Sequence, residues 1–244
     1  MVTAYDAWSA RIVASSNVDA ILVGDSAAMV VHGHRNTIDA TVEMMARHTS
    51  AVVRAAGGKL VIADLPFLSF RKGIVPAMFA VERLIRSGAS AVKLEGIDGH
   101  EDVIAHIVQS GIPVMGHIGL VPQSIHQLGG FRVQGRGDAA AQDVMRQARA
   151  LQQLGCFSVV LECIPGDLVA RITADLAIST IGIGAGSQTD GQVLVLHDLV
   201  GLSPRTPRFV RRYLDGSDLF TDALNRYDAD VKASRFPCST ETYS

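Results

Sequence analysis

Short apolar segments that each end in one polar residue recur along this chain, separated by segments of helical periodicity. Each apolar segment has the length of a β-strand, and glycines or prolines bound several of them. Strands that alternate with helices are expected to run parallel and to be covered on both faces. The segments with an ionisable last residue are 20–25, 59–64, 90–95, 112–117 and 157–162, which end in Asp25, Asp64, Glu95, His117 and Glu162.

The number of these segments predicts an α/β fold, a single (β/α)8 barrel of the TIM type. Three further strand-like segments, 2–6, 179–184 and 192–198, bring the total to eight, and a last helix is expected over 207–234. Such barrels have about 250 residues, and this chain has 244. An open doubly wound sheet is the competing architecture, but it does not readily explain why polar residues end so many strands. We expect one catalytic domain over residues 1–244, with a flexible tail from about residue 235.

Composition excludes several classes of function. The net charge of −2 offers no basic field for nucleic acid, and no polybasic patch for a membrane surface. No apolar run approaches the ~20 residues of a membrane span, and the N-terminus has no signal-peptide pattern. The three cysteines lack metal-site spacing. A cytoplasmic protein with reduced cysteines is therefore expected.

The strand predicted at 90–95 carries two charges on one face. Successive side chains of a strand point to opposite faces, so Lys93 and Glu95 share a side. Inward charges are costly unless they are paired or bind an ion. A buried structural ion pair would be the better interpretation of this strand alone. The other polar strand ends favour a functional site, because all strand ends of a barrel meet in a ring at its C-terminal face, where active sites form.

Three carboxylates in this ring, Asp25, Asp64 and Glu95, are hard oxygen ligands that suit Mg2+. Lys93 is a fitting counter-charge for an anionic substrate such as a 2-oxo acid, which could chelate the ion through its carboxylate and keto oxygens. A metal ion on the keto oxygen acts as a Lewis acid. This chemistry predicts proton abstraction beside a carbonyl, followed by formation or cleavage of a carbon–carbon bond.

Two further strand ends leave alternatives open. His117 could be a general base, could hold the substrate carbonyl, or could be a structural hydrogen-bond partner. Glu162 could be a base or acid whose pKa is raised by burial, or a member of an ion pair. The glycine-rich segment 119–137 follows the His117 strand directly. Its length and position predict a lid or binding loop rather than a flexible insertion without a function.

The order of several motifs resembles the 3-methyl-2-oxobutanoate hydroxymethyltransferase (ketopantoate hydroxymethyltransferase) family. The similarity extends from about residue 2 to about residue 213, and the number of ordered motifs makes it specific. The motifs are Val-Thr-Ala-Tyr-Asp at 2–6, Leu-Val-Gly-Asp-Ser at 22–26, Ala-Asp-Leu-Pro at 63–66, Val-Lys-Leu-Glu-Gly at 92–96, Gly-His-Ile-Gly-Leu at 116–120 with Pro-Gln at 122–123, Val-Gln-Gly-Arg at 133–136, Leu-Glu-Cys at 161–163, and Ile-Gly-Ile-Gly-Ala-Gly at 181–186 followed by Thr-Asp-Gly-Gln at 189–192.

The resemblance implies a barrel of the phosphoenolpyruvate mutase/isocitrate lyase group. It implies an enzyme that transfers a hydroxymethyl group from 5,10-methylenetetrahydrofolate to 3-methyl-2-oxobutanoate, giving 2-dehydropantoate for pantothenate and coenzyme A biosynthesis. A homo-oligomer, typically a decamer, is also implied. The residue roles implied are metal ligation by Asp25, Asp64 and Glu95, keto-acid binding by Asp25, Ser26, Asp64 and Lys93, and proton acceptance by Glu162. We expect His117 to contact the substrate as well.

The sequence departs from the family pattern in three places. It begins at the first strand and lacks the helix that usually precedes it, Arg35 replaces a usual Asp, and Ala27–Ala28 replace a usual Leu-Gly. Ala28 and Arg35 lie near the predicted site, so we expect these replacements to weaken substrate affinity. Two alternatives follow. One is a Mg2+-dependent lyase or aldolase of the same superfamily that acts on 2-oxo acids, and the other is a catalytically impaired subunit.

Overall fold

The computed structural model describes residues 1–130 and 132–243. They form two compact units, Met1–Val195 and Leu196–Ser244. The first contains the sheet and its covering helices, and the second contains α9 (Leu196–Leu199), α10 (Gly216–Lys232) and a short 3-10 helix, Ser239–Glu241. The expectation that all 244 residues form one domain, with a flexible tail from about residue 235, stays a prediction.

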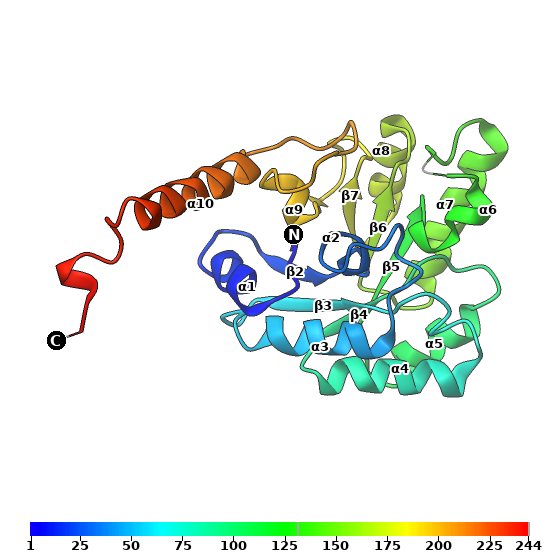
Figure 1. Cartoon of the computed structure of the whole chain (residues 1–244). Coiled ribbons are helices and arrows are strands. Elements are labelled where there is room, and N and C mark those ends of the chain that lie inside the picture. The colour runs from blue at the N-terminus through cyan, green and yellow to red at the C-terminus, as the bar shows by residue number, and fades with distance from the viewer. Residues whose placement is uncertain (131, 244) are drawn as a thin grey trace. The chain divides into compact units, whose positions relative to one another are not determined.

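The sheet of the first unit has eight parallel strands in sequence order (Figure 1). Its two outer strands also meet, because Val2 pairs in parallel with Leu194 and the Thr3 backbone N–H donates to the Leu194 carbonyl at 3.1 Å. The sheet therefore closes on itself, and the predicted (β/α)8 barrel is confirmed. The strands are β1 (Val2–Thr3), β2 (Ala20–Val23), β3 (Leu60–Asp64), β4 (Ala91–Lys93), β5 (Val114–Gly119), β6 (Ser158–Glu162), β7 (Ser179–Ile183) and β8 (Gly191–Gln192).

Amphipathic helices alternate with these strands, as Figure 1 shows. In the longest helix of the first unit, buried residues recur at helical spacing, with Val144, Met145, Ala148 and Leu151 on one face. Burial of that apolar face holds the helix against the sheet. The helices are α1 (Ala7–Ala14), α2 (Ala27–Val30), α3 (Val42–Val53), α4 (Ile74–Arg86), α5 (Glu101–Gln109), α6 (Ile125–Leu128), α7 (Asp138–Gln153) and α8 (Gly166–Asp175), and a 3-10 turn, η1 (Pro122–Ser124), precedes α6.

Two predicted boundaries are wrong. The last strand ends at Gln192, and Leu196–Leu199 is helical, because periodicity alone does not separate a short buried strand from a short helix. The last helix begins at Gly216 rather than at 207. Backbone hydrogen bonds from Tyr213 to Leu199 and from Gly216 to Val200 divert the preceding segment from helical pairing.

Candidate active site

The position of the predicted site follows from one layer of apolar side chains in the barrel interior. Ile62, Ala91, Met115 and Val160 belong to a single buried apolar cluster contributed by four neighbouring strands. Side chains two residues further along a strand point to the same side. The next layer towards the strand ends therefore consists of Asp64, Lys93, His117 and Glu162. The sequence pattern thus brings four ionisable side chains into one ring above the apolar core.

Asp64 and Lys93 form a buried ion pair in this ring. Lys93 Nζ lies 3.0 Å from Asp64 Oδ1, and both side chains are at most 5% exposed. The Asp25 backbone N–H donates to Asp64 Oδ2 at 2.9 Å, so the two aspartates are adjacent. Burial opposes the charge of Lys93, but Asp64, Glu95 and Asp25 together raise its pKa above the ordinary value. The ammonium group is therefore held firmly charged.

The surroundings of Asp25 and Asp64 disfavour the anionic form of both carboxyl groups. Burial, and then the charges of Glu95 and Asp64, hold the pKa of Asp25 well above its usual value. Burial also raises the pKa of Asp64, against the opposing effect of Lys93. Both groups would be stabilised as anions by additional positive charge.

His117 bridges two further carboxylates. Its Nδ1 lies 3.5 Å from Glu95 Oε1, and its Nε2 lies 3.1 Å from Glu162 Oε2. Burial and the charge of Lys93 disfavour protonation of His117, but its contacts with Glu162 and Glu95 outweigh them and raise the pKa of the imidazole to about 9. Burial alone would raise the pKa of Glu95, but the hydrogen bond and charge of His117, together with Lys93, lower it. The contacts with Glu95 and Glu162 therefore favour the protonated imidazole, while the Lys93 ammonium, whose Nζ lies 3.3 Å from Nδ1, opposes it.

Glu162 is the most accessible member of this group. Its side chain is 14% exposed, against 2% for Glu95 and 3% for His117. A base must reach its substrate while its orientation is held by a neighbour. Glu162 meets both conditions, because it lies at the last position of β6 and contacts His117.

Gln123 is a site residue that sequence reasoning did not single out, although it lies in one of the quoted motifs. Its Nε2 donates to Asp25 Oδ2 at 2.9 Å and to the Leu65 carbonyl at 3.0 Å. Its backbone N–H donates to Glu95 Oε2 at 2.9 Å. Gln123 comes from the segment predicted as a lid. That segment contributes at least one side chain to the site.

Ser26 follows Asp25 directly and lies beside the same group. Its hydroxyl is 2.8 Å from the hydroxyl of Tyr5, whose side chain is fully buried. Gly24 leaves room for this arrangement, because a Cβ atom there would lie 2.8 Å from Ser26 Oγ and 3.6 Å from Asp64 Oδ2. The predicted residues Asp25, Ser26, Asp64, Lys93, Glu95, His117 and Glu162 therefore lie in one connected group at the C-terminal ends of the strands.

The charge of this group fits a divalent cation. Four carboxyl groups face only one ammonium group and one imidazole, and burial, together with the neighbouring carboxylates, raises the pKa of Asp25. Carboxylate oxygens are also the donors that Mg2+ prefers. However, within residues 1–130 and 132–243 no three acidic, histidine or cysteine side chains already form a metal shell. Ligation by Asp25, Asp64 and Glu95 together therefore stays a prediction.

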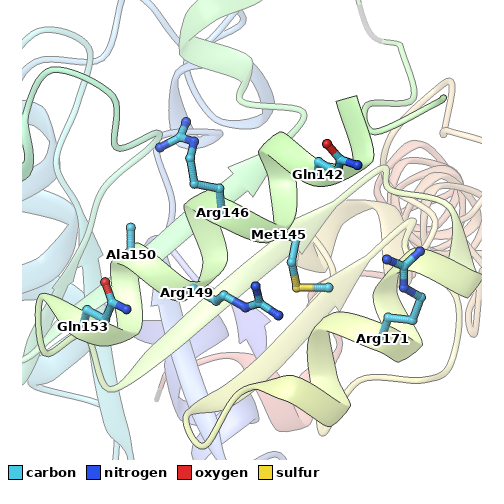
Figure 2. A pocket seen from close by; sticks show the side chains of 7 residues that line it. All are labelled: Gln142, Met145, Arg146, Arg149, Ala150, Gln153 and Arg171. Atoms are coloured by element: carbon cyan, nitrogen blue, oxygen red, sulfur yellow. The ribbon is translucent and has the colours of Figure 1, made fainter. Parts of the chain in front are cut away.

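Two cavities lie outside this buried group. The first, of about 450 Å3, lies on the outer surface of α7 and α8, where the Met145 side chain lies between Arg149 and Arg171 (Figure 2). None of the predicted site residues lines it. The second, of about 390 Å3, lies over the ends of β4 and β5, where Gly96 and Gly119 line it. Only the second adjoins the site, through the residues next to Glu95.

Two other sequence expectations can be compared with the structure. Cys156 is buried and Cys163 is half-buried, and both are free thiols, as is the exposed Cys238. Of the helices described, none is long and apolar enough to span a membrane.

Comparison with known proteins places these residues in a family. The family model described as ketopantoate hydroxymethyltransferase matches residues 1–239. A protein of Bdellovibrio bacteriovorus named 3-methyl-2-oxobutanoate hydroxymethyltransferase is 55% identical over 245 residues, covering 100% of this chain and 93% of its own length. A protein of the same name from Coxiella burnetii is 54% identical, covering 97% of this chain and 90% of its own length.

Solved structures support the fold. Phosphoenolpyruvate phosphomutase from Streptomyces platensis superposes with a TM-score of 0.64 at 14% identity, covering 96% of this chain and 82% of that structure. 2,3-Dimethylmalate lyase, a member of the PEP mutase/isocitrate lyase superfamily, gives 0.60 at 18% identity, with 97% and 82% covered. Identity this low speaks for the fold alone, whereas the match to the family model extends over nearly the whole sequence. The chain therefore belongs to the ketopantoate hydroxymethyltransferase family of enzymes.

Proposed function

We propose that this enzyme transfers the one-carbon unit of 5,10-methylenetetrahydrofolate to 3-methyl-2-oxobutanoate, which gives 2-dehydropantoate for pantothenate biosynthesis. The observation that carries the proposal is the connected ring of Asp64, Lys93, His117 and Glu162, with Asp25 and Glu95 beside it, in a chain of this family. Such a ring suits an anionic 2-oxo acid and the removal of a proton next to its carbonyl.

The keto acid would be bound by Asp25, Ser26, Asp64 and Lys93, with His117 beside them. Lys93 remains charged because three carboxylates surround it, so it offers a fixed positive charge to the substrate carboxylate. Asp25 and Asp64 would hold Mg2+, with Glu95 as a third ligand. When bound, Mg2+ would act as a Lewis acid at the keto oxygen and make the neighbouring C–H group more acidic.

Glu162 would accept the proton from C3 of the keto acid. His117 would orient the Glu162 carboxylate, because its Nε2 lies 3.1 Å from Glu162 Oε2. Hydrolysis of the methylene bridge by water would break its two C–N bonds and release formaldehyde and tetrahydrofolate. The carbanion formed at C3 would then attack the formaldehyde carbon, and the formaldehyde oxygen would take up a proton and become the hydroxyl group of the product. The second cavity, over β4 and β5, offers space next to this ring for the larger co-substrate.

We also propose a homo-oligomer, a decamer by resemblance to the family, located in the cytoplasm. Support for association comes from α10, where Leu219, Phe220, Leu224 and Tyr227 are all more than half exposed. Large exposed apolar patches are typical of surfaces that bind other proteins. Light scattering after size exclusion measures the number of subunits directly.

Exchange of the C3 proton in D2O tests the proton-transfer step without folate. We expect the wild-type protein with Mg2+ to replace this proton by deuterium, which NMR detects, and the Glu162→Gln variant to lose at least 100-fold of that rate. Binding of the keto acid should survive in the variant, because Glu162 is not among its proposed ligands. Undiminished exchange in Glu162→Gln would remove this residue from the mechanism.

A further inference from the structure

Gln123 connects two carboxylates that are far apart in the sequence. Its side chain donates to Asp25, 98 residues away, and its backbone donates to Glu95, 28 residues away. The residue is only 3% exposed, although it belongs to the short 3-10 turn of the segment after β5. Each carboxylate is therefore held by a hydrogen bond from the same residue.

The orientation of the Gln123 amide is set by its neighbours. Its NH2 group faces two acceptors, Asp25 Oδ2 and the Leu65 carbonyl, so both N–H donors are used. A flipped amide would place Oε1 against these two acceptors, which is unfavourable. In the present orientation Oε1 is buried and has no hydrogen-bond partner among the described residues. An unpaired buried acceptor is costly, so the two donor contacts must be strong enough to hold it there.

The two hydrogen bonds from Gln123 to Asp25 and Glu95 act against the electrostatic repulsion between these carboxylates. Asp25 and Glu95 are like charges in a buried site, and the presence of Glu95 destabilises the anionic form of Asp25. Without a shared donor the two carboxylates would be free to turn away from each other. Hydrogen-bonded neighbours of metal-binding carboxylates fix their orientation, and loss of such a neighbour typically weakens metal binding by about 10–100-fold.

We propose that Gln123 is a positioning residue that holds Asp25 and Glu95 in the arrangement required for a divalent cation, and thereby sets the cation affinity of the site. This inference rests on the proposed function for the location of the cation. It assigns a role to the segment after β5 as well, because the position of Pro122–Ser124 becomes coupled to the arrangement of the carboxylates. Gln123 acts through its neighbours and is not itself a ligand in this account.

Binding of Mn2+ to the purified full-length protein, followed by loss of the free-ion EPR signal, measures this affinity without turnover. Gln123→Met keeps the approximate length of the side chain and removes the NH2 group without adding a charge. We expect it to raise the Kd for Mn2+ by at least 10-fold. Gln127→Met is the matched control, because Gln127 is exposed on the same segment, and its Kd should stay within 2-fold of the wild type.

Several outcomes separate this inference from its alternatives. A merely structural role would lower the melting temperature of Gln123→Met and leave the Kd unchanged, which would overturn the proposal. If the Met variant does not fold, Gln123→Asn, whose shorter side chain withdraws the NH2 group from Asp25, supplies the comparison. A wild type that binds no Mn2+ would overturn it as well. A wild type that binds Mn2+ without forming 2-dehydropantoate would refute the proposed function, whereas the Kd values would still decide the role of Gln123.

Discussion

Replacement of Gly119 by alanine tests how closely the strand ends are packed at the proposed base. Gly119 ends β5 with a φ of +91°, and a Cβ atom there would lie 2.3 Å from the backbone carbonyl oxygen of Glu162. That carbonyl accepts a hydrogen bond from the Leu120 backbone N–H at 2.9 Å. The substitution must therefore displace the end of β5 or the end of β6.

The loss of unfolding free energy expected for Gly119→Ala has two contributions. A non-glycine residue in the left-handed region costs about 1–2 kcal/mol. Displacement of the Glu162 carbonyl disrupts one backbone hydrogen bond, worth about 1 kcal/mol, and crowds Ile164, whose side chain would lie 2.7 Å from the new Cβ. The expected loss for Gly119→Ala is therefore about 3 kcal/mol of unfolding free energy. Gly111→Ala is the control, because Gly111 has a φ of +85° and open space around its Cβ position, so its loss should be about 1 kcal/mol.

Urea unfolding of both variants measures this difference, and the C3 proton exchange assay measures its effect on Glu162. We expect Gly119→Ala to lose exchange activity beyond what its stability explains, while Gly111→Ala retains it. Equal stability losses in the two variants would refute the reasoning, because strain from positive φ would then account for both. Normal exchange in Gly119→Ala would show that the Glu162 side chain does not depend on this close contact.

Two further predictions concern buried groups. Lys93→Met should lower the unfolding free energy, measured in EDTA, by about 3 kcal/mol, because the Asp64 carboxylate stays buried and loses the ammonium group that pairs with it. The double variant Lys93→Met/Asp64→Asn should recover most of that loss. No recovery of the unfolding free energy in urea would contradict the ion-pair account. Burial raises the pKa of Cys156 to about 12, so its thiol is protonated at pH 8 and becomes a reactive thiolate only as the pH rises towards that value. Iodoacetamide at pH 8 should therefore label the exposed Cys238 well before Cys156, and equal labelling rates by mass spectrometry would contradict the burial of Cys156.

Alternation of strands and helices was sufficient to predict the barrel, and the parity of side chains along each strand was sufficient to predict much of the site. Lys93 and Glu95, two residues apart, are both buried within one charged group, as the period of a strand requires. Asp64, His117 and Glu162 join them because each lies two residues beyond a buried apolar residue of the same strand. Regular elements therefore carry their side chains to predictable places.

The site role of Gln123 could not be predicted from side-chain periodicity. It lies in a 3-10 turn of an irregular segment, and no periodicity indicates where such a segment crosses the barrel mouth. Its contact with Asp25 depends on the tertiary path of the chain. The end of the last strand was missed for a related reason, because a short apolar run is compatible with both strand and helix until its backbone hydrogen bonds are known. His117 was left with several roles because its pKa depends on both carboxylates beside it.

A steady-state assay with 3-methyl-2-oxobutanoate, 5,10-methylenetetrahydrofolate and Mg2+, with and without EDTA, tests the central claim most directly. The account predicts formation of 2-dehydropantoate that requires both the folate and the metal ion, and that stops when EDTA is added. Absence of product from folded protein that still binds the keto acid would contradict the account, as would product formation that is unaffected by EDTA.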